Sequence, residues 1–369
     1  MKPDTHRRQF ILGTAALLAQ AGLSRSALAD LLKPGRVPTV DSLTVKVLID
    51  STYDTSRPGT SKWVKIKRTP FVSQTDFRKT LHNEWGLSLS LESHIGSDTR
   101  NLMLDYGYTP EVLLNNMELI GVDPSKLDAL IVSHGHYDHF GGLLGFLDKF
   151  RDKLPADVKL YAGGEDNFCA RKATRGAPGQ FSDAGVLDRR ELEALRVKVV
   201  SCEQPTVILG HAFTTGAIVR RSFERVLPTS LIEYGVKNGV GCNMPALNAK
   251  TEGKPVADEH YNEHATCFNV KDRGLVVITS CGHAGVVNSL RQAMEASGVS
   301  KVHAVMGGMH LFPADEEYLR RSVAELKTLN PDVVIPMHCS GPGFVTAMRE
   351  QMPDRLITST TGTEYLFGA

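Results

Sequence analysis

Short apolar segments alternate with amphipathic stretches through the C-terminal part of the chain, and this alternation constrains the fold more than any other feature. The predicted elements are strands at 274–279, 301–306 and 332–336, and helices at 286–297, 315–329 and 344–351. Strands that each lead into a helix are typical of sheets covered by helices, so the series predicts an α/β protein.

The N-terminal half repeats the same alternation. Strands are predicted at 43–50, 87–92, 101–105, 127–132 and 158–162, and helices at 110–120 and 143–150. Residues 51–80 are polar and rich in turn formers, which predicts a loop. Residues 165–265 are less regular and contain many Gly, Pro and Arg residues, so part of this segment is interpreted as an insertion or cap.

The strand at 127–132 leads directly into the run His134-Gly135-His136-Tyr137-Asp138-His139. His134 and His136 are two residues apart, so in an extended segment they point to the same side and can share one ion. Asp138 and His139 reach a second position as the chain turns into the next helix at Gly141-Gly142, where glycine permits close backbone approach. Imidazole and carboxylate ligands suit zinc, with iron or manganese as alternatives.

The pattern H-x-H-x-D-H after an apolar strand resembles the signature of the metallo-β-lactamase superfamily. Other segments resemble one branch, which contains the archaeal dihydropterin–ribofuranosylaminobenzene phosphate synthases and related metal-dependent hydrolases. These segments are Glu84-Trp85-Gly86-Leu87-Ser88, Leu104-Asp105-Tyr106-Gly107, Cys281-Gly282-His283-Ala284-Gly285, Gly307-Gly308-Met309-His310 and His338-Cys339-Ser340-Gly341. The resemblance implies a four-layered αββα sandwich with one or two divalent metal ions. The catalytic domain would span 30–369, with the insertion or cap at about 165–265.

The resemblance also implies ligands outside the histidine run. His338 follows the strand at 332–336, where the superfamily places its last ligand. After the strand at 274–279 the superfamily commonly has an aspartate, but this chain has Cys281 there and His283 two residues later. Either side chain could coordinate an ion, and we expect His283 to be the ligand, with Cys281 beside it or also bound. The expected metal ligands are His134, His136, Asp138, His139, His283 and His338.

Several other polar residues stand near predicted strand ends. Asp105 ends the strand at 101–105 and is expected to orient a ligand histidine. His310 follows the strand at 301–306, and we expect it to face the substrate as an acid or to stabilise developing negative charge. The alternative for His310 is a ligand role. His260 and His264 lie where a third histidine of the first metal position would fall, but no motif supports either, so a solvated loop is expected.

A divalent ion lowers the pKa of a bound water molecule to about 7 and so provides hydroxide at neutral pH. The expected function is therefore a hydrolase whose metal-bound hydroxide attacks a small-molecule ester, lactone or phosphoester, with Asp138 and His310 as catalytic residues. One alternative is a dihydropterin-type transferase resembling the archaeal synthase. The other is a non-catalytic, metal-dependent binding protein, against which the complete ligand run argues.

The first 29 residues differ in composition from the rest of the chain. Arg7-Arg8 precedes an apolar stretch that runs to Gly22, and Ala27-Leu28-Ala29 forms a small-x-small cleavage site. This pattern resembles a twin-arginine export signal at 1–29, so the export machinery is an expected partner and the mature protein is expected to be periplasmic or secreted. Export argues against the transferase, because phosphorylated pterin intermediates are cytoplasmic.

Composition excludes some other classes of partner. The formal net charge is only +1, so bulk electrostatics gives no reason to expect nucleic-acid binding. The apolar stretch near the N-terminus is short and contains Gly, Gln and Ser, which argues against a stable membrane anchor. The chain has six cysteines without a C-x-x-C pair, and their pairing cannot be deduced from spacing.

Overall fold

The computed structural model describes residues 37–56, 59–70, 72–174, 180–227 and 230–368. The predicted export signal at 1–29 lies outside the described residues. Within those ranges, no helix combines the length and the apolar character that a membrane span requires.

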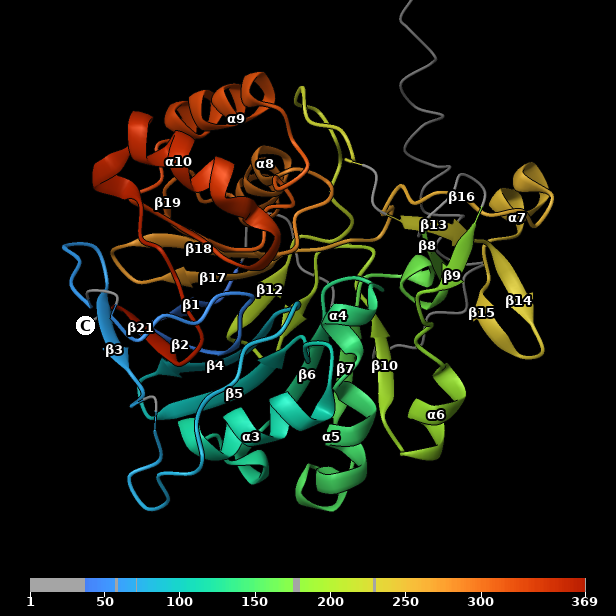
Figure 1. Cartoon of the computed structure of the whole chain (residues 1–369), viewed down its shortest axis with the longest axis horizontal. Helices are drawn as coiled ribbons and strands as arrows, with labels where there is room; N and C mark the ends of the chain where they lie inside the picture. The colour runs from blue at the N-terminus through green and yellow to red at the C-terminus, as the bar shows by residue number, and fades with distance from the viewer. Residues whose placement is uncertain (1–36, 57–58, 71, 175–179, 228–229, 369) are drawn as a thin grey trace, which may run out of the picture. The chain divides into compact units, whose positions relative to one another are not determined.

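Two β-sheets lie face to face at the centre of the fold (Figure 1). The first sheet has the order β10-β7-β6-β5-β4-β2-β21-β3, and the second has the order β11-β12-β17-β18-β19-β20, with β1 paired to β17. The strands of the first sheet are β2 (Ser42–Ile49), β3 (Lys65–Arg68), β4 (Ser88–Ile95), β5 (Asp98–Leu104), β6 (Ala129–Val132), β7 (Lys159–Ala162), β10 (Lys198–Ser201) and β21 (Thr363–Gly368). Those of the second are β1 (Thr39–Val40), β11 (Val207–Ile208), β12 (Ala212–Thr214), β17 (Thr266–Val270), β18 (Gly274–Ser280), β19 (Val302–Gly307) and β20 (Val333–Pro336).

Side-chain alternation along the strands explains why the two sheets pack together. Val45 and Val47 of β2 point into the space between the sheets, where they join Val276 and Ile278 of β18 in one buried cluster. Ile49, at the end of β2, belongs instead to the cluster on the outer face of the first sheet. Both sheets are therefore apolar on two faces, so each needs a covering layer on its outer side.

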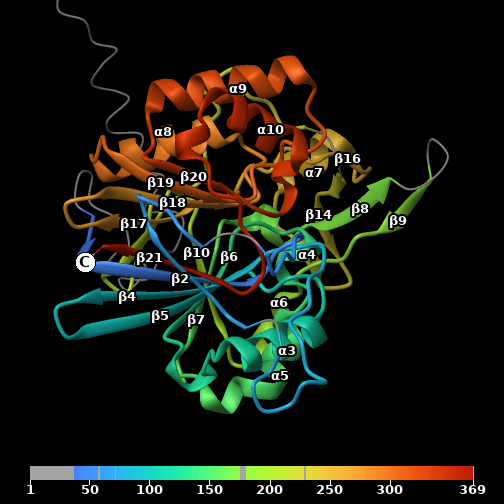
Figure 2. The ribbon, with the colours of Figure 1, turned by 60° about the vertical axis from the view of Figure 1, so that its left-hand side comes forward.

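Helices provide those outer layers, as Figure 2 shows from a second direction. The first sheet is covered by α3 (Pro110–Ile120) and α5 (Leu143–Phe150). The second is covered by α8 (Val286–Ser297), α9 (Glu316–Leu329) and α10 (Gly341–Gln351). The order helix, sheet, sheet, helix confirms the predicted αββα sandwich.

The predicted α3, α5 and α8 have the same bounds in the structure as in the sequence analysis. Three strands of the first sheet were not predicted, and one of them, β10, lies in the segment at 165–265. β3 lies inside the segment at 51–80 that was expected to be a loop, and it pairs only with β21 in the sheet order. β21 brings the end of the chain back between β2 and β3, which is a long-range pairing that local periodicity does not reveal.

The segment at 165–265 is divided between the large sheets and smaller units. β10, β11 and β12 belong to the two large sheets, so the segment is not one uninterrupted insertion. The remaining elements are β8 (Ala170–Thr174), β9 (Phe181–Asp183), β13 (Ser230–Glu233), β14 (Gly235–Lys237), β15 (Val240–Cys242), β16 (Val256–Ala257), α6 (Arg189–Ala194) and α7 (Pro245–Thr251). A disulfide joins Cys169 to Cys242 within this segment. The role of these smaller units as a cap stays a prediction.

Candidate metal centre

Parallel pairing brings the predicted site residues together. β5 and β6 are parallel neighbours in one sheet, and β18, β19 and β20 are parallel neighbours in the other. Their carboxyl ends therefore lie at one edge of each sheet, where loops carry binding groups in α/β folds. The residues that follow these strand ends are Asp105, His134, Cys281, His283, His310 and His338.

The histidine run turns sharply after β6 into the short helix α4 (Tyr137–Phe140). A Cβ atom at Gly141 would lie 2.2 Å from the carbonyl oxygen of Tyr108, and one at Gly142 would lie 2.3 Å from that of Tyr106. The predicted close backbone approach at these glycines is confirmed. It lets the loop bend so that Asp138 and His139 face the same space as the two earlier histidines.

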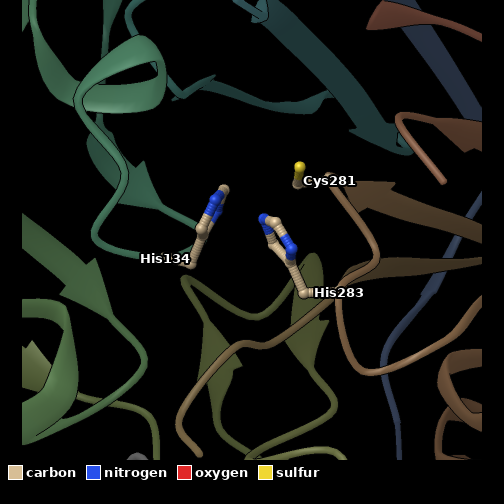
Figure 3. Close-up of side chains that lie close together, drawn as sticks. All are labelled: His134, Cys281 and His283. Atoms are coloured by element: carbon tan, nitrogen blue, oxygen red, sulfur yellow. The ribbon is translucent and has the colours of Figure 1, made fainter. Parts of the chain in front are cut away.

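One group of ligand atoms consists of imidazole nitrogens. His136, His260 and His283 each offer a ligand atom within 4.8 Å of the others, and so do His134, His283 and Cys281. The rings of His260 and His283 are stacked, with centroids 3.7 Å apart and an interplanar angle of 3°. Figure 3 shows the rings of His134 and His283 facing one another across the site, with Cys281 beside them. This arrangement fits one ion.

A second group lies next to the first and contains the carboxylate. His139, His338 and Cys281 offer ligand atoms within 4.8 Å of one another. The Nε2 atom of His338 lies 3.2 Å from Oδ2 of Asp138, and the Nε2 atom of His139 lies 3.9 Å from the same oxygen. The structure thus places the six predicted ligands in two adjoining groups, with the Cys281 sulfur near both. That these groups bind ions stays a prediction.

Several buried imidazole nitrogens have no hydrogen-bond partner among the described residues, which tests whether an ion fits. Six of these atoms belong to the site: Nε2 of His134, Nε2 of His139, Nδ1 of His260, both ring nitrogens of His283 and Nε2 of His310. The other two, Nδ1 of His264 and Nε2 of His303, belong to no ligand group of the described residues. A buried polar group without a partner costs about 1–3 kcal/mol, so a cluster of such atoms is expensive unless another group satisfies them. Divalent metal ions are suited to this role because neutral imidazole is a preferred ligand.

The pKa shifts differ between the two groups. Burial is the main cause that lowers the pKa of His134 and of His283 well below the ordinary value, and neighbouring imidazoles lower both further. Both rings are therefore neutral, which is the form that binds metals. Burial also opposes protonation of His338, but Cys339 and Asp138 raise the pKa of its imidazole to about 10. Burial raises the pKa of Asp138, yet the charges of His139 and His338 hold it well below the ordinary value.

Three buried carboxylates fix the loops that carry these ligands. Asp105 accepts hydrogen bonds from the backbone N–H of Ser133 at 2.8 Å, from the Ser133 hydroxyl at 2.8 Å and from Nδ1 of His139 at 2.7 Å. Asp50 accepts a hydrogen bond from the backbone N–H of His338 at 2.7 Å. The Nδ1 atom of His338 lies 3.0 Å from the Ser51 hydroxyl, which leaves its Nε2 toward Asp138. Asp105 thus contacts the predicted ligand His139 and the residue before His134, and its orienting role stays a prediction.

The third carboxylate belongs to Glu263, which the sequence analysis did not identify. Its two oxygens accept hydrogen bonds from the backbone N–H groups of Gly282 at 2.8 Å, His283 at 3.0 Å and Ala284 at 2.7 Å. This carboxylate is buried and holds the loop after β18 in place. No motif could have revealed it, because it acts on backbone atoms of a loop about 20 residues later in the chain.

Left-handed backbone conformations are concentrated at the site. Asp105, His260, Ser280, His310 and His338 have φ angles of 58°, 47°, 58°, 45° and 46°. Such conformations cost of order 1–3 kcal/mol each in non-glycine residues and persist where the surrounding structure imposes them. Four of these five residues, all except His260, end or follow strands that lead to the site, which indicates that the fold gives up stability to aim these side chains.

Two side chains had a different expected position. His260 was expected in a solvated loop, but it is buried and belongs to the first ligand group, where it contacts His136 and His283. The expectation failed because burial of an irregular loop depends on tertiary packing that periodicity does not report. His264 is also buried, but its Nε2 atom lies 3.1 Å from the carbonyl oxygen of Val132, and it belongs to neither ligand group.

A cavity of about 220 Å³ opens beside the two groups. Aromatic rings form much of its wall, and they include the half-exposed Trp85, Tyr108, Tyr137 and Phe312. Asp138, His310 and His338 also line it, so the predicted catalytic residues face the same space. Trp85 packs edge-on against the His338 ring, with centroids 4.8 Å apart. The cavity can therefore hold a small molecule against both ligand groups.

Known proteins with similar sequences and folds agree with this geometry. The family model for the metallo-β-lactamase superfamily matches residues 94–220. A 7,8-dihydropterin-6-methyl-4-(β-D-ribofuranosyl)-aminobenzene-5′-phosphate synthase of Methanocaldococcus jannaschii is 27% identical over 264 residues, which cover 70% of this chain and 82% of the relative. An uncharacterised protein of the same organism is 24% identical over 279 residues, which cover 76% of this chain and 92% of the relative.

A solved structure shares the fold. The crystal structure of a metal-dependent hydrolase of the β-lactamase superfamily superposes with a TM-score of 0.61 at 20% identity, covering 87% of this chain and 98% of that one. Together with the αββα layers and the histidine run at the end of β6, these similarities show that the chain has the metallo-β-lactamase fold and that residues 94–220 match the model of that superfamily.

Proposed function

We propose that this protein is a metal-dependent hydrolase that cleaves a small ester or lactone. The observation that carries the proposal is the pair of adjoining ligand groups beside the cavity, which His136 of the first group and His338 of the second help to line, together with the unpartnered imidazole nitrogens in both groups. Such groups have no packing role that would compensate for their burial. The similarity to the superfamily also supports a hydrolase, since its fold commonly carries hydrolytic metal sites. Fold alone does not decide a reaction.

The residues divide into two ion positions. His134, His136, His260 and His283 would hold the first ion, and Asp138, His139 and His338 the second. We propose zinc, because imidazole ligands beside the Cys281 sulfur suit it better than manganese. Divalent ions bound by these residues would supply a hydroxide nucleophile at neutral pH and would polarise the group under attack.

The chain's own residues position the reaction. Asp138 is ionised and reaches both His139 and His338, so it can also accept a hydrogen bond from the attacking water and orient it. His310 lines the cavity, and its Nε2 atom has no partner in the described part of the chain. This nitrogen is suited to donate a hydrogen bond to an oxygen that gains negative charge. The aromatic rings around the cavity would hold the apolar part of the substrate and limit access of bulk water.

The cavity wall favours carboxylic esters and lactones over phosphorylated substrates. Of the described side chains that line it, none is a lysine or an arginine. Lys172 lies nearby but forms an ion pair of 2.7 Å with Asp183, which is part of the wall. Phosphate sites usually contain arginine or lysine, which pair with the phosphate oxygens. A phosphoester remains an option for the assay, because metal ions themselves bind phosphate.

The second candidate is a transferase resembling the archaeal synthase. The similarity to that relative over 70% of this chain favours it. A transferase that joins phosphorylated intermediates would have to neutralise their phosphates, and the described wall offers little charge for that purpose. The hydrolase therefore stands as the first candidate.

A substrate panel tests the proposal. Purified protein loaded with zinc would be assayed against aryl esters, lactones, phosphomonoesters, phosphodiesters and thioesters, with the chelated protein as control. We expect metal-dependent release of product from an ester or lactone. Metal-dependent activity confined to phosphorylated substrates would overturn the proposed substrate class. Absence of hydrolysis across the panel, together with condensation of a pterin diphosphate and an aromatic amine, would favour the transferase.

We also propose that the protein is exported through the twin-arginine route, on the basis of Arg7-Arg8 and the apolar stretch after it. Replacing Arg7-Arg8 by Lys-Lys is expected to retain the precursor in the cytoplasm, because recognition depends on the arginine pair. Cell fractionation and mass spectrometry of the N-terminus measure export and processing. The native protein is expected to yield a mature chain that begins near Asp30, and the Lys-Lys variant is not. Normal processing and export of the Lys-Lys variant would refute this route.

A further inference from the structure

Two buried thiols lie in contact at the floor of the cavity. Cys281 follows β18 and Cys339 follows β20, and their sulfur atoms are 3.1 Å apart. Both side chains are almost fully buried, yet both line the cavity. In the proposed hydrolase, Cys281 lies beside the metal ligands, but Cys339 has no function.

A third donor faces the same two sulfur atoms. The Nδ1 atom of His310 lies 3.6 Å from the Cys281 sulfur, and the backbone N–H of His310 donates a hydrogen bond of 3.3 Å to the Cys339 sulfur. Cys281, His310 and Cys339 each offer a ligand atom within 4.8 Å of the others. A Cβ atom at Gly308 would lie 2.8 Å from the Cys339 sulfur, so the glycine leaves the room that this sulfur occupies.

The two ion positions of the proposed hydrolase do not need Cys339, although the Cys281 sulfur lies within reach of both. The first has four imidazoles from two overlapping sets of ligand atoms, and the second has two imidazoles and a carboxylate; Cys281 belongs to one set of each. Four ligands complete a tetrahedral zinc site, and three ligands leave the open position that a catalytic zinc site retains. Cys339 is therefore available for a separate purpose, and Cys281 can be shared between that purpose and the neighbouring ion positions.

We propose that Cys281, Cys339 and His310 form a further subsite for a thiophilic d¹⁰ cation, such as Zn²⁺, Cd²⁺ or Cu⁺, which adjoins the nitrogen-rich centre and shares Cys281 with it. Two thiolates and one imidazole are a soft donor set that favours such ions over magnesium, calcium or manganese. Binding releases the two thiol protons, so the two thiolate charges balance a divalent ion. The two thiolate charges are needed because, without them, the cation at this subsite would be repelled by the two neighbouring ions only a few ångströms away.

The position of the subsite suggests what it does. Its three side chains form part of the cavity wall, so an ion there would be reached from the cavity and would contact a bound substrate or inhibitor that carries sulfur. The free position on such an ion suits a thiolate, a thioether or a thiocarbonyl group. The subsite would thus add a sulfur-selective contact to a cavity whose other walls are aromatic.

Cadmium titration of the zinc-loaded full chain tests the subsite, with the variants Cys339→Ala and Cys267→Ala. Cys267 is also a buried free cysteine, but it lies in β17 and belongs to none of the ligand groups of the described residues, so it is the matched control. The wild type and Cys267→Ala are expected to show the ultraviolet thiolate-to-cadmium charge-transfer band. Cys339→Ala is expected to lose that band and to bind one ion per chain at least tenfold more weakly. Loss of a residue that only supports a ligand already weakens metal binding by about 10–100-fold, so loss of a ligand should cost at least as much.

Native mass spectrometry of the same samples counts the ions and checks the fold. If Cys339→Ala retains the ions of the nitrogen-rich centre and binds one cadmium fewer than the wild type, the subsite is supported. Equal cadmium binding and equal charge-transfer bands in the wild type and Cys339→Ala would overturn it. A wild-type chain that shows no band and a mass lower by the two hydrogens of a Cys281–Cys339 disulfide would also overturn it. Neither outcome depends on whether the protein hydrolyses an ester, so failure of the proposed function remains distinguishable.

Discussion

Asp138→Asn is expected to lower kcat by about 10³-fold or more while the protein keeps its fold. The change preserves volume but removes the negative charge that lies 3.2 Å from Nε2 of His338 and 3.9 Å from Nε2 of His139. Loss of one well-placed electrostatic contact alone costs about 10²–10³ in kcat. Asp138 is expected to hold an ion and to orient the attacking water, so its loss should cost at least the upper end of that range.

The measurement compares kcat, metal content and the thermal transition in the wild type, Asp138→Asn and Asp183→Asn. Asp183 lines the same cavity, but its side chain is 89% exposed and paired with Lys172, so it is a matched removal of charge. The control is expected to keep kcat within about threefold of the wild type, since exposed ion pairs contribute little. Unchanged turnover in Asp138→Asn would contradict the proposed mechanism.

Asp105→Asn is expected to cost about 3 kcal/mol of the free energy of unfolding and to weaken metal binding by about 10–100-fold. The Asp105 carboxylate accepts three hydrogen bonds, from the backbone N–H and hydroxyl of Ser133 and from Nδ1 of His139. An asparagine has only one oxygen, and its NH₂ group would face donors that need an acceptor. The His139 ring would lose its fixed orientation, because the bond to Nδ1 is what turns Nε2 toward the site.

Urea denaturation of the metal-free chain and competition with a metal chelator measure these two effects separately. Asp98→Asn is the control, because Asp98 lies at the start of the same strand and is 51% exposed. Its free energy of unfolding is expected to change by less than about 1 kcal/mol. If Asp105→Asn and Asp98→Asn had equal stability and equal metal affinity, the orienting role of Asp105 would be wrong.

Much of the fold could be predicted from local patterns. α3, α5 and α8 combine an apolar stripe with residues that start or end helices, such as Pro110 at the first turn of α3 and Gly298 after α8. The strands that carry the ligands are short apolar runs buried on both faces, and such runs could also be predicted from the sequence. β21 was missed because it is defined by pairing with β2, more than 300 residues earlier in the chain, and no local signal reports such a pairing.

The site was predicted only in part, because some of its residues are close together in the sequence and others meet only through tertiary packing. The run from His134 to His139 is dense enough in ligand types to be recognised alone. His338, His283 and His310 follow buried strands, so their position at a sheet edge was predictable. His260 and Glu263 lie in an irregular loop and reach the centre only through tertiary packing. Cys339 stands beside a recognised ligand, but its contact with Cys281 depends on two separate strand ends meeting.

The most direct test of the central claim is elemental analysis and turnover measured on one and the same preparation. The account predicts up to two transition-metal ions per chain in the nitrogen-rich centre, loss of turnover when a chelator removes them, and recovery when zinc is restored. His134→Ala is expected to lower both metal content and turnover, because it removes a ligand of the first position. A preparation that contains no bound metal and nevertheless turns over substrate at the full rate would contradict the account.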